Sequence, residues 1–241
     1  MHALREGLAR AASAPAVLVG AIAVLWWLKG VADPRSSIAG FVLWAFLSGG
    51  MLDRYARQRP LRARGFFAAC GGHFFAMLRL GAIVVLLNAV VHVALAAHVG
   101  SPPVMVLAIV LLSAIAVVTI FGQIRLVVED RRSAIGALLA GGRFVRRHPA
   151  SIGLYVVFMT LVAVVVWATS TPVADPDSWT AMAWVTARFA LMSYVVLALY
   201  AAGIALFQSR LAHAGYAAAP PLEWPESPAA EAIANAARLT P

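Results

Sequence analysis

The sequence predicts an all-α, polytopic membrane protein with six transmembrane helices, and two observations carry that prediction. The first is composition, because 62% of the residues are hydrophobic and only 12% are charged. A soluble domain has roughly 45–50% apolar and about 25% charged residues. The second is a series of apolar runs near the length of about 20 residues that a helix needs to cross the hydrocarbon core. Six such runs in 241 residues leave no room for a separate soluble domain.

The predicted spans follow one another from the N-terminus, with turn residues between them. They cover residues 14–32, 36–53, 76–100, 103–126, 150–170 and 180–208. The first run follows Arg5 and Arg10 and resembles the apolar core of a signal peptide, but it ends in Trp26-Trp27-Leu28-Lys29 where a small-residue cleavage site would stand. We therefore predict an uncleaved first span, a transmembrane domain over residues 1–215, and a flexible Pro-rich cytoplasmic tail over residues 216–241.

Basic residues determine the predicted orientation. Fifteen of the 19 Lys and Arg residues fall in segments on the same side as the N-terminus, and only Lys29 and Arg35 fall in the segments opposite. The positive-inside rule then places both termini in the cytoplasm. All but one of these basic residues are arginine, beside abundant Ala and Val. That bias is typical of a GC-rich genome, so the predicted location is a bacterial cytoplasmic (inner) membrane.

Two inner segments, residues 65–78 and residues 125–149, are predicted to form interfacial amphipathic helices. The second places four apolar or small residues at helical spacing on one side, namely Ile135, Leu138, Leu139 and Gly142. A helix of this kind lies flat in the headgroup layer with its arginines on lipid phosphate. The net charge of +9 then indicates anionic lipid as the partner, and nucleic acid is not expected. The predicted headgroup-binding residues are Arg57, Arg62, Arg64, Arg132, Arg143, Arg146 and Arg147.

These two segments also resemble each other. Gly65 is followed by FFAAC and Gly71-Gly72, Gly136 is followed by ALLA and Gly141-Gly142, and an acid–arginine cluster precedes each. The pattern predicts a repeat of two spans plus an inner helix; the alternative is that short inner loops of such proteins are generally alike. Six spans with basic segments after the second and fourth resemble the membrane domain of bacterial glycerophosphodiester phosphodiesterases and related six-span integral membrane proteins. The resemblance implies a lipid-contacting role without the phosphodiesterase activity, because nothing in the sequence matches the catalytic barrel.

Residues that carry chemistry are scarce. No acidic residue lies inside an apolar run, since Asp53 only ends the second one, Cys70 is the only cysteine, and no Gly-rich phosphate loop precedes a lysine. We therefore predict a protein that is not an enzyme and holds no cofactor or metal. Asn88 and His92 share a face of the third span, and Arg188 lies at a similar depth in the sixth. They are candidates for an intramembrane polar cluster; the alternative is that Arg188 snorkels to the headgroups and His92 bonds to backbone.

The leading hypothesis is a non-enzymatic integral membrane protein that binds anionic lipid through its basic inner-face helices. It would serve as a scaffold or accessory subunit in lipid or envelope processes. Its expected partners are membrane lipids, together with another membrane protein or a second copy of the chain. The alternative is a small transporter or permease with a polar path near Asn88, His92 and Arg188. A polar cluster that joins a cavity favours the transporter, whereas a dry apolar bundle favours the scaffold.

Overall fold

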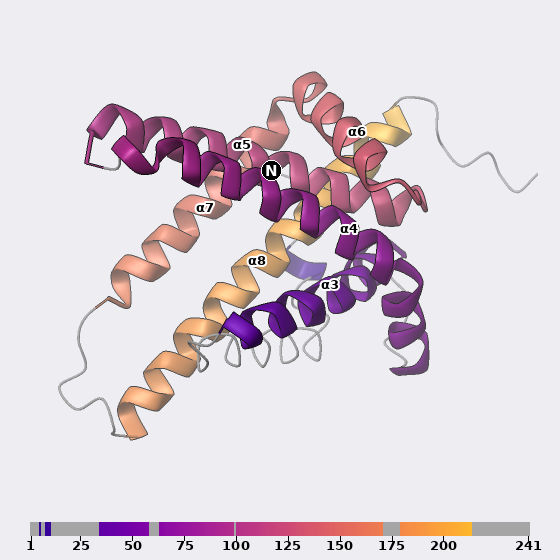
Figure 1. Ribbon diagram of the computed structural model, residues 1–241. Helices are drawn as coiled ribbons and strands as arrows, with labels where there is room; N and C mark the ends of the chain where they lie inside the picture. Colours follow the sequence, from indigo (N-terminus) through magenta and orange to yellow (C-terminus); the bar gives the residue numbers. More distant parts are fainter. Residues whose placement is uncertain are drawn as a thin grey trace, which may run out of the picture. The chain divides into compact units, whose positions relative to one another are not determined.

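Helices make up the regular structure in the part of the chain that the structure describes. The computed structural model describes residue 5 and residues 8–10, 34–57, 63–98, 100–170 and 179–213. No strand occurs within these ranges. The helices are α3 (Pro34–Arg57), α4 (Ala63–Leu95), the short 3₁₀ helix η1 (Ala96–His98), α5 (Pro102–Val128), α6 (Ala134–Arg147), α7 (Ala150–Ala168) and α8 (Trp179–His213) (Figure 1). The predicted all-α class is therefore confirmed for these residues.

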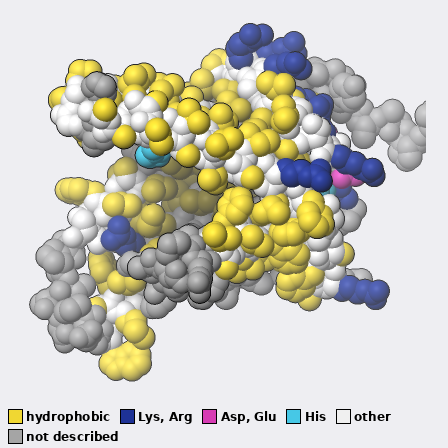
Figure 2. Space-filling view, in the orientation of Figure 1, with side chains coloured by type: hydrophobic (Ala, Val, Ile, Leu, Met, Phe, Trp, Pro, Cys, Tyr) yellow, Lys and Arg dark blue, Asp and Glu magenta, His cyan; other side chains and the backbone are white. Residues whose placement is uncertain are grey.

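Four of the described helices, α4, α5, α7 and α8, are long and apolar enough to cross a membrane. Large apolar side chains stay exposed along them, among them Val85, Val90 and Val93 of α4 and Val106 and Ile109 of α5. Figure 2 shows hydrophobic side chains over most of the visible face, with Lys and Arg gathered in a few patches. An exposed apolar surface of this extent is unfavourable in water and favourable against lipid tails. The chain is a membrane protein.

The structure supports four of the six predicted spans. Residues 76–100, 103–126, 150–170 and 180–208 fall largely within α4 and η1, α5, α7 and α8. Residues 36–53 lie within α3, which is not among the four helices found over the described residues. This helix is less apolar than the other four, because it contains Ser48, Gly49 and Gly50 and ends in charged residues. The predicted first span and the predicted tail lie outside the described residues.

The aromatic inner segment forms the beginning of α4, where a separate interfacial helix was predicted. No proline interrupts the chain between Ala63 and Leu95, so helical hydrogen bonding continues from this segment into the apolar run. The N-terminal turns of α4 run in a different direction from its long remainder (Figure 1). The segment contains Gly71-Gly72, a pair of the kind at which helices bend. Of the two predicted inner helices, only α6 is therefore a separate element.

Glycines in α3 bring it close to the beginning of α4. A Cβ atom added to Gly50 would lie 2.4 Å from Cys70 Sγ and 3.1 Å from the Phe66 carbonyl oxygen. One added to Gly49 would lie 2.8 Å from the Cβ of His73. Backbones approach this closely only where side chains are small. The C-terminal end of α3 is therefore held against the inner segment of α4.

A close backbone contact at a glycine also joins α5 to α6. A Cβ atom added to Gly141 would lie 2.7 Å from the backbone nitrogen of Gly122 and 2.8 Å from the Val118 carbonyl oxygen. Ala137, four residues before Gly141, is buried on the same face of α6. Two small residues four apart are the pattern through which membrane helices pack most closely. The face of α6 that packs on α5 therefore contains these small residues together with Phe144, whose ring lies 5.0 Å from that of Phe121, whereas Ile135 and Leu139 are exposed.

Two further contacts attach α8 to α5 near the same level of α5. The Tyr200 hydroxyl donates a hydrogen bond to Oε1 of Gln123 at 2.8 Å. A Cβ atom added to Gly203 would lie 2.9 Å from Cδ1 of Ile124. A polar pair buried at this position satisfies both partners in surroundings that offer no water. The Gly122–Arg125 stretch of α5 is thus a packing centre of the described fold.

Candidate functional site

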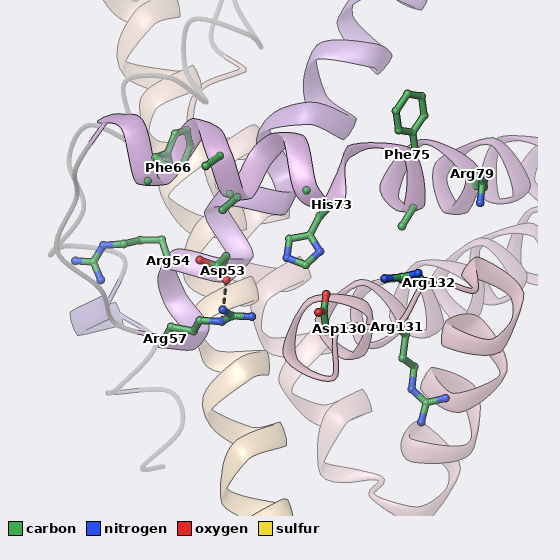
Figure 3. Close-up of a pocket in the computed structure, with 16 residues that line it drawn as sticks. Asp53, Arg54, Arg57, Phe66, His73, Phe75, Arg79, Asp130, Arg131 and Arg132 are labelled. Atoms are coloured by element: carbon green, nitrogen blue, oxygen red, sulfur yellow. Dashed lines mark ion pairs between the residues drawn. The ribbon is translucent and has the colours of Figure 1, made fainter.

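A pocket of about 830 Å³ lies where the two inner segments meet. Its walls come from the C-terminal end of α3, the N-terminal half of α4, and the turn between α5 and α6 (Figure 3). Five arginines line it, namely Arg54, Arg57, Arg79, Arg131 and Arg132, together with Asp53, Asp130 and His73. Positive charge exceeds negative charge among these lining residues, so this arginine pocket favours an anion.

The turn between α5 and α6 delivers three of the lining residues. Asp130 has a φ of 50°, and the Arg131 backbone N–H donates to the Leu126 carbonyl at 2.9 Å. A left-handed residue followed by this bond is the Schellman ending of a helix, in which Asp stands at a position that glycine usually fills. Ser133 then caps α6, because its Oγ accepts from the Gly136 N–H at 3.1 Å. The two helix ends therefore determine where Asp130, Arg131 and Arg132 lie.

Ion pairs occupy some of the charges around the pocket. Arg57 Nε lies 2.9 Å from an Asp53 carboxylate oxygen, one turn apart on α3. Glu129, the residue that follows α5, binds Arg125 of that helix at 2.7 Å and also binds Arg131. These pairs reduce the attraction that Arg57 and Arg131 exert on an incoming anion. In Figure 3 the Arg131 side chain also points away from the pocket.

Four charged groups of the pocket have no ion pair or side-chain hydrogen bond within the described part of the chain: Arg54, Arg79, Arg132 and Asp130. Arg54 comes from α3 and points away from Asp130 in Figure 3, Arg79 comes from α4, and Arg132 and Asp130 come from the α5–α6 turn. In Figure 3 the His73 ring lies between the Asp53–Arg57 pair and Asp130. Arg79 and Arg132 therefore give the pocket two unpaired guanidinium groups from different elements, beside the unpaired carboxylate of Asp130.

The predicted headgroup-binding arginines are only partly brought together. Arg57 and Arg132 line the pocket, whereas Arg64, Arg143, Arg146 and Arg147 are exposed outside it. Arg62 lies outside the described residues. On α6, Ile135 and Leu139 are also exposed, by 62% and 58%. Large apolar side chains and arginines thus share the surface of α6 that does not pack on α5.

Sequence reasoning missed Arg54, Arg79, Arg131, Asp130 and His73 as members of a site. Arg79 carried a usable signal, because it is a charge at the start of the long apolar run of α4, a position that is costly without a purpose. The other residues gave none, since their proximity depends on how α3, α4 and the α5–α6 turn pack together. Residues in these three segments are too far apart in sequence for spacing to reveal a common pocket.

The candidate polar cluster has its hydrogen bonds within α4. Asn88 Nδ2 donates a hydrogen bond to the Val84 carbonyl at 2.8 Å. The imidazole Nδ1 of His92 lies 2.8 Å from the backbone carbonyl oxygen of Asn88, and because that oxygen can only accept, Nδ1 is the donor. Among the described residues, no hydrogen bond or ion pair joins either side chain to Arg188. Both side chains therefore form their hydrogen bonds with the backbone of their own helix. A polar path shared with Arg188 stays a prediction.

Within the described ranges, no group of three or more His, Cys, Asp or Glu residues could hold a metal ion. The chain matches no protein-family model, no curated protein and no solved structure. The resemblance to the membrane domain of glycerophosphodiester phosphodiesterases therefore stays a prediction from the pattern of spans and basic segments.

Proposed function

We propose that this chain is a non-enzymatic membrane protein that binds anionic lipid through its basic inner-face segments. It acts as a scaffold or accessory subunit in lipid or envelope processes of a bacterial inner membrane. In this proposal, α3 and the residue 14–32 run complete a six-span topology with both termini in the cytoplasm. The Lys and Arg distribution along the sequence supports this orientation.

The observation that carries the proposal is the surface of α6. Its small residues face α5, which leaves Ile135 and Leu139 exposed beside the exposed Arg143, Arg146 and Arg147. Apolar side chains at the boundary of the acyl chains and arginines at the phosphates suit a helix in the headgroup layer. Ser133 and the Arg125 guanidinium, which donates to the Ala140 carbonyl at 3.1 Å, hold this helix in place.

Replacement of Arg143, Arg146 and Arg147 together by Gln tests the proposal. Each arginine near an anionic surface contributes about 1 kcal/mol, screened within a Debye length. We expect the purified triple variant to retain less anionic lipid, measured by lipid mass spectrometry, and to lose most of the salt dependence of that retention.

The triple replacement by Lys is the matched control, because it keeps the charge and should keep most of the lipid. Equal lipid content and equal salt response in the wild type and the Gln variant would contradict the proposal. Loss of lipid in both triple variants would indicate that the geometry of the arginines matters more than their charge.

The second candidate, a small transporter, has one observation in its favour. Arg188 is half-buried within α8, a helix apolar enough to span a membrane. Arginine is rare at such positions and often marks a pathway. The local hydrogen bonds of Asn88 and His92 give this candidate no further support.

A further inference from the structure

We propose that the arginine pocket binds a single phosphodiester lipid headgroup whose alcohol carries free hydroxyl groups. Arg79 and Arg132 bind the phosphate, and Asp130 selects the headgroup by accepting a hydrogen bond from a hydroxyl. This inference rests on the proposed function and specifies one lipid class and one site for it. Phosphatidylglycerol is the common lipid with this chemistry.

The phosphate end of the site follows from the available arginines. Arg79 and Arg132 line the same pocket from different elements and have no ion-pair partner among the described residues. Guanidinium groups bind phosphate oxygens through short, charge-assisted hydrogen bonds, often two at a time. A phosphate between these two groups would neutralise charge that the surrounding described structure leaves uncompensated. Arg57 and Arg131 serve this purpose less well, because Asp53 and Glu129 already pair with them.

Asp130 determines which phosphate fits. Its carboxylate has no partner in the described chain and lies in the same pocket as Arg79 and Arg132. A carboxylate there repels a phosphomonoester, which approaches two negative charges near neutral pH. It accepts hydrogen bonds from hydroxyl groups without penalty. The headgroup best matched to the pocket therefore carries one negative charge and at least one hydroxyl donor.

The remaining wall of the pocket suits a lipid better than a free phosphate. Along α4 it is formed by small residues, including Gly65, Ala69 and Ala76, with the rings of Phe66 and Phe75 beside them. The Phe75 side chain is 66% exposed. Small side chains leave room for the glycerol backbone of a lipid, and exposed phenylalanine contacts acyl chains favourably.

The test is a titration of the full chain in detergent micelles with three probes: short-chain phosphatidylglycerol, short-chain phosphatidic acid and inorganic phosphate. We expect the wild type to bind phosphatidylglycerol most tightly and inorganic phosphate most weakly. Arg79→Gln and Arg132→Gln should each weaken phosphatidylglycerol binding by about tenfold or more, as expected for a charge-assisted hydrogen bond. Arg35→Gln, which removes the same charge near the start of α3, should leave binding unchanged.

Asp130→Asn is the selectivity variant, and asparagine suits the left-handed backbone at this position. We expect the preference for phosphatidylglycerol over phosphatidic acid to fall by roughly three- to tenfold. An unchanged preference would overturn the role of Asp130. Inorganic phosphate binding as tight as that of phosphatidylglycerol would overturn the lipid assignment.

The two proposals fail separately. Unchanged affinity in Arg79→Gln and Arg132→Gln, together with lipid loss in the α6 triple variant, overturns the pocket site and leaves the proposed function standing. A wild type that retains no anionic lipid overturns both. Should either Gln variant fail to give a monodisperse protein, Arg79→Lys and Arg132→Lys take its place. Lysine keeps the positive charge but lacks the paired N–H donors of a guanidinium, so we expect an affinity between those of the wild type and the Gln variants. Wild-type affinity would contradict a bidentate contact.

Discussion

At the scale of single residues, adjacent glycines on α6 have opposite surroundings. A Cβ atom on Gly141 would meet backbone atoms of α5 at 2.7 and 2.8 Å, whereas on Gly142 the nearest atom is a Val118 methyl carbon at 3.8 Å. Backbone cannot move aside as the end of a side chain can. The size of one residue therefore sets the distance between the two helices.

Gly141→Ala should destabilise the protein, and Gly142→Ala should not. Alanine at Gly141 forces α6 away from α5, and overpacking of this kind costs about 1–3 kcal/mol. At Gly142 the gain in helix propensity, roughly 0.5–1 kcal/mol, meets no steric opposition. Thermal unfolding in detergent, followed by circular dichroism, should show a lower Tm for the first variant and an equal or higher Tm for the second. Equal Tm values in both variants would contradict the close contact.

Arg188 is the residue that separates the two candidate functions. The leading proposal gives this side chain no binding role, so Arg188→Leu should be tolerated. The cost of inserting an arginine at the centre of a span is about 2.5–3.5 kcal/mol and falls near an interface. The variant should therefore express at least as well as the wild type and retain the same anionic lipid. A folded variant that loses transport of a solute across proteoliposomes would favour the transporter.

At the scale of elements, the two halves of the predicted repeat are alike in packing as well as in sequence. One half is α3 with the beginning of α4, and the other is α5 with α6. Gly50 of α3 contacts Phe66, and Gly122 of α5 contacts Leu138. Each of these glycines is followed three residues later by an ion pair one turn apart, Asp53–Arg57 in α3 and Arg125–Glu129 in α5. The order of the charges is reversed between the two pairs. The contacts favour the internal repeat over a general likeness of short loops.

The two ion pairs should nevertheless differ in their contribution to stability. Arg125 is half-buried, binds Glu129 and donates to the Ala140 carbonyl of α6. Arg57 is exposed and pairs only within its own helix turn, as far as the described residues go. Arg125→Gln should therefore cost about 1–3 kcal/mol, and Arg57→Gln at most about 0.5 kcal/mol. Chemical unfolding of both variants in the same detergent measures the difference in the free energy of unfolding. Equal decreases in both variants would contradict a stabilising contact between Arg125 and α6.

At the scale of the whole molecule, the apolar helices and the basic residues together predict the membrane topology. Four helices could cross a membrane by length and composition, and the six-span arrangement adds α3 and the residue 14–32 run. An even number of spans places both termini on one side. The excess of basic residues in residues 54–64 and 125–147 predicts that this side is the cytoplasm.

Cysteine labelling in intact cells tests this topology in a background with Cys70→Ala. Cysteines at positions 33 and 177 should react with an impermeant thiol reagent from outside, because both lie between predicted spans on the outer side. Cysteines at positions 58 and 133 should react only after the membrane is permeabilised. Outside labelling at position 58 or 133 would reverse the orientation, and protection at position 33 would remove the first pair of spans.

The sequence by itself determined the helical class, the membrane location and the approximate positions of the four apolar helices. Apolar runs such as 103–126 and 150–170 need a helix because backbone groups in lipid have no water to bind. It also identified the basic stretch around Arg143–Arg147 and singled out Arg57 and Arg132, which line the pocket. These features depend on local composition and on the spacing of residues along the chain, and both can be read from the sequence.

Only the tertiary structure decided how the inner segments are used. It showed that residues 65–78 continue into α4, because no helix breaker separates them from the apolar run. It joined Arg79 of α4 to Arg132 and Asp130 of the α5–α6 turn in one pocket. Side-chain proximity across helices depends on packing distance, and a sequence read along one chain contains no measure of that distance.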